Sequence, residues 1–183
     1  SKVINSYLED GHAEKVPITE LDRPKGQKFY IPHHHVDHPR KNIRVVFDTA
    51  SETDGRSLST EVYPGPDVLN SLVGVLIRFR QGKVPVTADL RRYYHSVYLP
   101  KSDVDFFRYF WFSVPDDPTS PIQEYRLLIH LFGGCWSQAV CAHGLLRAIL
   151  DAVKPGSITS EEAQLLLRAF YSDDFARSYD STL

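Results

Sequence analysis

The stretch Phe170-Tyr171-Ser172-Asp173-Asp174 decides the fold prediction, because it places two neighbouring carboxylates directly after an aromatic pair. Adjacent carboxylates repel each other. They are tolerated on a turn in water, or where a divalent cation neutralises them. A second stretch, Val84–Asp89, ends a short apolar run in a single aspartate. We predict that two strands bring these aspartates together around one metal site.

The rest of the chain alternates between helical and extended patterns. Apolar spacing predicts helices over residues 2–9, from Leu69 to near Gly82, and over residues 136–153. Thr159 and Glu162 have the spacing of a capping box, which predicts another helix leading to Phe170. Strands are expected at Phe29–Ile31, Asn42–Asp48 and Val84–Asp89, with an antiparallel pair formed by Phe106–Val114 and Glu124–Leu131.

Composition places limits on the class of protein. The 183 residues, 42% of them apolar, are enough for one domain with a real core. The sequence contains neither a long apolar run nor a secretion leader, so we expect no membrane partner and an intracellular location, in cytoplasm or nucleus. A net charge of −2 argues against a dedicated nucleic-acid binder. Basic clusters occur at Arg40–Arg44, at Arg78, Arg80 and Lys83, and at Arg91–Arg92; for the second of these we favour a solvated face.

Six stretches share their order and spacing with one known family. They are Ile43–Asp48, Gly55–Leu58, Pro64–Leu72, Val86–Asp89, Phe132–Gly133 and Tyr171–Asp174. Together they resemble the reverse transcriptase domain of BEL/Pao-type LTR retrotransposons, over nearly the whole chain. The resemblance implies an α+β fold: the fingers (about 1–85) and palm (86–183) of a right-hand polymerase, with an antiparallel palm sheet packed on helices. The thumb, connection and RNase H segments of the family would lie beyond Leu183.

The resemblance also implies roles for individual residues. Asp89, Asp173 and Asp174 would hold two Mg²⁺ ions for nucleotidyl transfer, with an RNA or DNA template-primer and a dNTP as partners. Arg44 resembles the fingers residue that holds the nucleotide phosphates, and Tyr94 resembles the aromatic gate that disfavours a ribose 2′-hydroxyl. Phe132, Gly133 and Ser137 resemble the loop-to-helix segment beside the nucleotide and template.

Some positions depart from the family pattern. Leu90–Tyr94 replaces an acidic-basic-apolar stretch, and Gln138 stands where a proline is usual. Arg177 replaces part of an apolar strand, and we expect that it could pair with Asp173 or Asp174 and compete with magnesium. These changes leave open whether the chain is an enzyme. The alternative function is a domesticated, inactive domain that serves as a scaffold for a host protein partner.

Simpler interpretations stay open for each motif. Asp173 and Asp174 could form a solvated turn, Asp89 could cap one, Tyr94 and Phe132 could be core aromatics, and Arg44 could pair with Asp48. The segment Pro32–His38 contains four histidines and one aspartate, which are suitable zinc ligands, but a run of adjacent histidines rarely presents convergent nitrogens. A nucleophilic triad using Ser137 and His143 is less favoured, because the sequence has no Gly-x-Ser-x-Gly turn.

Overall fold

The computed structural model describes residues 2–38, 41–114 and 116–181, without the side chains at positions 38, 41 and 42. The basic stretch Arg40–Arg44 and the imidazole of His38 therefore lie partly outside the described residues. The chain divides into two compact units, each built from two segments: unit 1 contains residues 1–64 and 94–137, and unit 2 contains residues 65–93 and 138–183.

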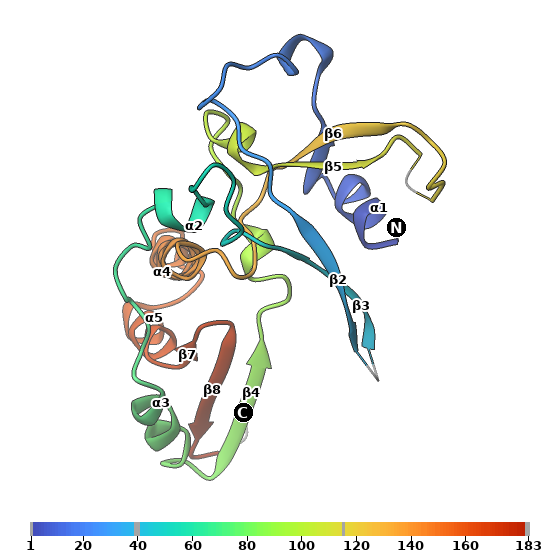
Figure 1. Ribbon diagram of the computed structural model, residues 1–183. Helices are drawn as coiled ribbons and strands as arrows, with labels where there is room; N and C mark the ends of the chain where they lie inside the picture. The colour runs from blue at the N-terminus through green and yellow to red at the C-terminus, as the bar shows by residue number, and fades with distance from the viewer. Residues whose placement is uncertain (1, 39–40, 115, 182–183) are drawn as a thin grey trace. The chain divides into compact units, whose positions relative to one another are not determined.

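Unit 1 is organised around a three-stranded antiparallel sheet in the order β1-β6-β5 (Figure 1). Its strands are β1 (Ala13–Lys15), β5 (Arg108–Phe112) and β6 (Ile122–Leu127). β5 and β6 form the antiparallel pair predicted from their aromatic and apolar content, with Tyr109 opposite Tyr125. Both strands are shorter than predicted, but their pairing is confirmed.

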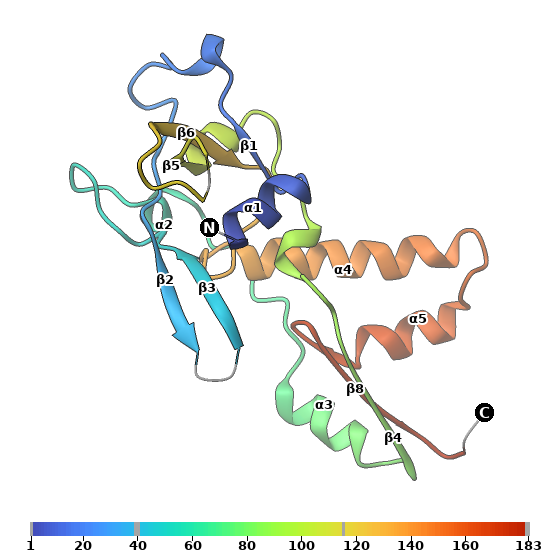
Figure 2. The same ribbon diagram turned by 90° about the vertical axis from the view of Figure 1, so that its right-hand side faces the viewer.

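A hairpin of β2 (His33–His38) and β3 (Lys41–Phe47) extends from unit 1 (Figure 2). β3 confirms the strand predicted at residues 42–48. The strand predicted at Phe29–Ile31 is wrong, because only Tyr30 forms a bridge, to Arg108. Pro32 follows at once and has no N–H to donate, so regular pairing begins at His33.

Aromatic packing forms the core of unit 1. Tyr109 is fully buried and packs against the rings of Tyr125, Phe47 and His33. Short helices surround this core: α1 (Lys2–Glu9), α2 (Leu58–Glu61) and the 3₁₀ turns η1 (Ile18–Glu20), η2 (Tyr94–Ser96) and η3 (Val104–Phe107). α1 confirms the helix predicted at residues 2–9.

A buried ion network crosses the sheet of unit 1. The guanidinium of Arg108, which is 0% exposed, contacts Asp105 at 2.7 Å and Glu124 at 2.9 Å. Arg126 contacts the same Asp105 oxygen at 3.0 Å and also reaches Glu14 and Glu20. Because every buried charge in this group has opposite partners, the network satisfies the charges that the core encloses.

Unit 2 consists of a second antiparallel sheet, in the order β4-β8-β7, and three helices. Its elements are α3 (Leu72–Phe79), β4 (Val84–Asp89), α4 (Ser137–Val153), α5 (Ser160–Leu167), β7 (Phe170–Tyr171) and β8 (Asp174–Tyr179). α5 runs back beneath α4 (Figure 2). With mixed helices and antiparallel sheets in both units, the predicted α+β class is confirmed.

Local chemistry explains where the helices of unit 2 begin. The Thr159 hydroxyl accepts from the Glu162 N–H while the Glu162 carboxylate accepts from the Thr159 N–H, which is the predicted capping box. α3 begins three residues later than predicted, because the Ser71 hydroxyl caps the Gly74 N–H. Among the described residues, no helix combines the length and apolar character needed to cross a bilayer.

Candidate functional site

The two predicted aspartate stretches lie on neighbouring strands of unit 2. β4 and β8 lie side by side (Figure 1). Asp89 ends β4 directly opposite Asp174, the first residue of β8, and the Leu90 N–H donates to the Asp173 carbonyl at 2.9 Å. Residues opposite each other in an antiparallel pair have Cβ atoms about 4.5–5.5 Å apart. The prediction that these strand ends meet is confirmed.

A two-residue turn presents Asp173 between β7 and β8. Tyr171 pairs with Asp174, so Ser172 and Asp173 form the loop, and Ser172 has a φ of 55°. A residue with a side chain rarely adopts this left-handed conformation without support. The support is a hydrogen bond from the Ser172 hydroxyl to the Gln138 side-chain oxygen of α4, at 3.0 Å. The Gln138 side chain thus holds the turn.

The three carboxylates carry uncompensated charge. Asp89 and Asp174 are exposed and Asp173 is half-buried. No ion pair or side-chain hydrogen bond joins any of them to another residue in the described part of the chain. Like charges directly opposite each other in a sheet destabilise the pairing. The arrangement therefore costs free energy in the absence of a cation.

Asp89 and Asp174 line one cavity of about 470 Å³ between the sheet and α3. Its other walls include the apolar side chains of Val75, Phe79 and Phe175. Apolar walls lower the local dielectric constant, so a cation beside the two carboxylates would be attracted more strongly than in bulk water.

The donor set fits magnesium by its chemistry. Carboxylate oxygens are hard ligands, and Mg²⁺ is usually held by one or two carboxylates with waters and substrate phosphates completing the shell. Among the described residues, no group of three or more His, Cys, Asp or Glu side chains is assembled to hold a metal ion by protein ligands alone. Two opposed carboxylates and a third on the adjoining turn match the first type of site rather than a closed protein cage.

Arg177 does not block the carboxylates. Successive side chains of a strand point to opposite faces, so Arg177, three residues after Asp174, projects from the other face of β8. Its guanidinium lies over the Tyr179 ring, 5.2 Å from the centroid. The expected pairing of Arg177 with Asp173 or Asp174 is absent from the described ion pairs, and the reason is this alternation.

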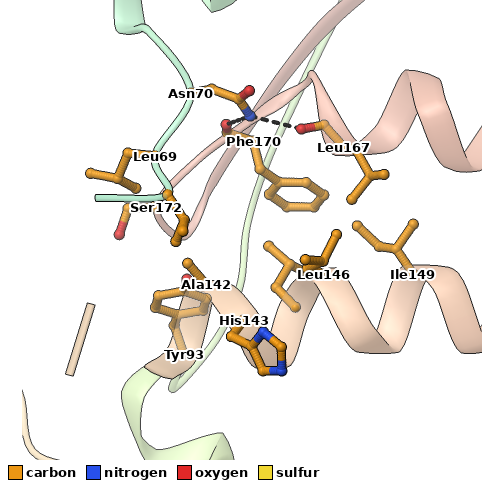
Figure 3. Close-up of a pocket in the computed structure, with 12 residues that line it drawn as sticks. Leu69, Asn70, Tyr93, Ala142, His143, Leu146, Ile149, Leu167, Phe170 and Ser172 are labelled. Atoms are coloured by element: carbon orange, nitrogen blue, oxygen red, sulfur yellow. Dashed lines mark hydrogen bonds between the residues drawn. The ribbon is translucent and has the colours of Figure 1, made fainter. Parts of the chain in front are cut away.

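Asn70 fixes the strand that leads into the acidic turn. Its side-chain amide donates to the carbonyls of Leu167 at 2.7 Å and Phe170 at 2.8 Å (Figure 3). Leu146 and Ile149 of α4 line the same pocket, which has a volume of about 190 Å³. Asn70 thus joins the end of α5 to β7 and stabilises the approach to Ser172. The sequence motif contains Asn70, but nothing local in the sequence predicts this role.

The residues expected to bind nucleotide belong to unit 1. Tyr94 begins η2 and meets the Phe132 ring edge-to-face, at 5.4 Å between centroids. Phe132 is 70% exposed, so it is not the core aromatic that the simpler interpretation suggests. Gly133 is exposed with a φ of +93°, which L side chains rarely adopt. The exposed Phe132 ring thus packs against Tyr94, and the turn that follows it favours glycine at position 133.

Arg44 and Ser137 differ in accessibility. Arg44 is exposed on β3, and no described ion pair connects it with Asp48, whose carboxylate accepts from the Ala50 N–H instead. Its guanidinium is accessible to an anion. Ser137 is 1% exposed, and its hydroxyl has no hydrogen-bond partner among the described residues. Ser137 is therefore in contact with protein atoms, and a direct contact with nucleotide remains a prediction for it.

The alternative sites receive no geometric support within the described residues. His33 and His34 are successive strand residues and point to opposite faces of β2, and no three-ligand metal group includes them. Burial, followed by the nearby charge of His34, lowers the pKa of His33. Ser137 and His143 are six positions apart on α4, which puts their side chains on different faces of the helix, and the Ser137 hydroxyl has no hydrogen-bond partner among the described residues.

Comparison with known proteins identifies the fold. No protein-family model and no curated protein matches the chain. A solved structure described as the foamy viral protease-reverse transcriptase dRH in complex with ds DNA superposes with a TM-score of 0.65 at 16% sequence identity. The fold resembles that of a retroviral reverse transcriptase. The match covers 98% of this chain and only 25% of the viral one, so the chain corresponds to a quarter of that protein.

Proposed function

We propose that this chain is the fingers and palm of a BEL/Pao-type retrotransposon reverse transcriptase and supports RNA-directed DNA polymerisation. The observation that carries the proposal is the register of β4 and β8, which sets Asp89 opposite Asp174 beside the Asp173 turn. None of the three carboxylates has a cationic partner among the described side chains, and Asp89 and Asp174 line a cavity with apolar walls.

Asp89, Asp173 and Asp174 would hold magnesium, which would supply positive charge to neutralise nucleotide phosphates and to favour loss of the proton from a primer 3′-hydroxyl. Asp89 and Asp174 hold their oxygens at fixed register on the sheet, and the Ser172–Gln138 hydrogen bond orients Asp173. Preorganised ligands of this kind avoid reorganisation when charge develops in the transition state.

The unit 1 residues are proposed to select the nucleotide. The exposed Arg44 guanidinium offers a planar fork that suits phosphate oxygens. The edge-to-face pair of Tyr94 and Phe132 offers an aromatic surface against which a sugar can pack. Gly133, whose backbone is not shielded by a Cβ, allows close approach of a ligand.

Primer extension tests the proposal. The chain is incubated with a primed RNA template, dNTPs and Mg²⁺, and the Asp173→Asn and Asp89→Asn variants are measured beside it. We expect extension by the parent chain and a loss of at least about a hundredfold in each variant, the size expected when transition-state charge stabilisation is removed. Asp22→Asn is the matched control, because Asp22 is exposed in unit 1 and its side chain has no partner among the described residues.

A protein-binding scaffold is the second candidate, and an exposed apolar surface on α3 favours it. Val73 is 66% exposed and Ile77 is 58% exposed, four residues apart on one helix face. Exposed apolar patches mark interaction sites. If the folded chain neither extends a primer nor binds Mg²⁺ by calorimetry, the polymerase proposal is refuted and the scaffold function is favoured.

A further inference from the structure

Three arginines from three different elements line one cavity of unit 2. Arg78 belongs to the last turn of α3, Arg168 is the C-cap of α5, and Arg177 lies on β8. The cavity has a volume of about 570 Å³. Its lining residues on β8 run from Ala176 to Tyr179. Ala176 is the one lining residue that it shares with the cavity beside Asp89 and Asp174, and none of the three arginines lines that other cavity.

The cavity is formed where β8 loses one neighbour. β7 pairs only with residues 174 and 175, and the last contact on that side is the Ala176 N–H donating to the Ala169 carbonyl at 3.0 Å. On the other side, a Cβ at Gly82 would lie 2.7 Å from the Tyr179 backbone, so glycine is required for this close crossing. The Gly82 N–H also donates to the Ser178 hydroxyl at 2.7 Å. These contacts on both sides hold the part of β8 that lines the cavity in place.

The three guanidinium groups have no carboxylate partner. No described acidic side chain lies within 4.0 Å of any of them, although the exposed Asp180 also lines the cavity. Arg78 donates to the Arg168 carbonyl at 2.8 Å, and Arg177 lies over Tyr179. The Nε atoms of Arg78 and Arg177 are buried with no hydrogen-bond partner in the described part of the chain. By contrast, the buried arginines of unit 1 each contact at least two carboxylates.

Helix electrostatics explain only part of this cluster. A cation is favoured at a helix C-terminus, which suits Arg78 and Arg168. Arg177 is on a strand and gains nothing from a helix dipole, yet it adds a third positive charge to the same cavity. Asp180 is the one acidic residue lining this cavity and makes no described ion pair with the three arginines, so gathering their like charges is unfavourable and an anion that contacts all three would reduce the cost.

We propose that this cavity binds a phosphate group through Arg78, Arg168 and Arg177. Planar guanidinium forks match the tetrahedral oxygens of phosphate and can bind them in bidentate pairs. The phosphate is either a phosphodiester of a nucleic-acid strand or a free phosphate ion. The site uses no metal and none of the three aspartates Asp89, Asp173 and Asp174, so it goes beyond the proposed polymerase function.

Two binding measurements in EDTA test the site and distinguish the sources. The first is fluorescence anisotropy with a labelled single-stranded 12-nucleotide DNA at several salt concentrations. The second is calorimetric titration with inorganic phosphate. The variants are Arg78→Gln, Arg168→Gln and Arg177→Gln, with circular dichroism as the check on folding. Arg147→Gln is the matched control, because Arg147 is an exposed arginine of the same unit that is paired with Asp151 on α4.

We expect each of the three variants to lose at least about tenfold in affinity, the effect of removing one charge-assisted hydrogen bond. For DNA, the slope of log affinity against log salt should fall by about one per arginine. The control should bind as the parent chain does. Arg168 is exposed and its side chain makes no hydrogen bond within the described part of the chain, so Arg168→Gln should fold even if Arg78→Gln does not.

The ligand that responds identifies the source of the phosphate. Loss of DNA binding in the variants assigns the cavity to a nucleic-acid backbone, and loss of phosphate binding alone assigns it to the free ion. Equal weakening by Arg147→Gln would indicate a diffuse charge effect and overturn the proposal, as would unchanged binding of both ligands to folded Arg168→Gln and Arg177→Gln. Because magnesium is absent and Asp89→Asn should bind normally, failure here is separable from failure of the polymerase proposal.

Discussion

The aspartates of the two units differ in burial and in ion pairing. In unit 1, Asp105 is 6% exposed and accepts hydrogen bonds from both Arg108 and Arg126. In unit 2, Asp89 and Asp174 face each other across a sheet with no cation near them among the described residues. In the first arrangement, the charged groups pair with one another and stabilise the fold. The second leaves its carboxylates without a cationic partner among the described residues, and the proposed metal site depends on this difference.

The largest expected effect comes from breaking the unit 1 network. Asp105→Asn removes the shared carboxylate and leaves Arg108 and Arg126 partly unpaired in the core. We expect a loss of about 3 kcal/mol in the free energy of unfolding, as for other buried ion pairs that lose one partner. Urea denaturation measures it. The matched substitution Asp89→Asn should change stability by less than about 0.5 kcal/mol, and an equal loss in the two variants would contradict the comparison.

The same contrast predicts how stability depends on pH. Burial alone raises the pKa of Asp105, but the hydrogen bonds from Arg108 and Arg126 outweigh burial and leave the pKa below its ordinary value. A carboxyl whose pKa is lowered on folding contributes stability above its unfolded pKa, near 3.9, and loses it as the pH falls through the folded value. We expect thermal stability to fall below about pH 4. The fall should be shallower in Asp105→Asn, and parallel profiles would refute this role for Asp105.

Magnesium should stabilise unit 2 through the free carboxylates. A ligand that binds only the folded state at ten times its Kd adds about 1.4 kcal/mol of stability. Thermal melts with increasing Mg²⁺ should therefore shift upward for the parent chain and for Asp105→Asn, provided the latter is folded. The shift should disappear in Asp173→Asn. A shift that survives in that variant would place the metal elsewhere.

The smallest expected effect concerns the acidic turn. Ser172→Ala removes the hydrogen bond to Gln138 and should cost about 1 kcal/mol in urea denaturation. Primer extension should fall as well, because Asp173 is then less firmly oriented. Ser172→Gly is the variant to compare with Ser172→Ala. It also removes the hydroxyl, but glycine adopts a φ of 55° without strain. Equal stability of the parent and Ser172→Ala would show that Gln138 does not hold the turn.

Local patterns predicted much of this fold from the sequence. The capping box of α5, the β5–β6 pair and the strand ending at Asp89 all follow from residues close together in the chain. The strand expected at Phe29–Ile31 failed because Pro32 limits pairing to one bridge. The convergence of Asp89 with Asp174 was predicted from two acidic strand ends and then from the family resemblance, although no local pattern fixes the register of β4 and β8.

Long-range polar contacts were beyond sequence reasoning. Arg126 contacts Glu14 and Glu20, more than a hundred positions earlier, and no spacing rule links such residues. The Asn70 amide, which reaches Leu167 and Phe170, was missed for the same reason. The three arginines that line one cavity of unit 2 come from α3, the C-cap of α5 and β8. Because they are far apart in the chain, the sequence suggested only a solvated face around Arg78.

The pairing of β4 with β8 also has a consequence for the order of folding. Asp89 and Asp174 are 85 positions apart, and closing a loop of that length costs about 4 kcal/mol of chain entropy beyond a constant. During synthesis, β4 leaves the ribosome long before its partner strand exists. The acidic site is therefore expected to assemble late, after residues 94–137 can already fold as part of unit 1. A chain interrupted before β8 would carry a well-packed first unit and would lack the acidic site.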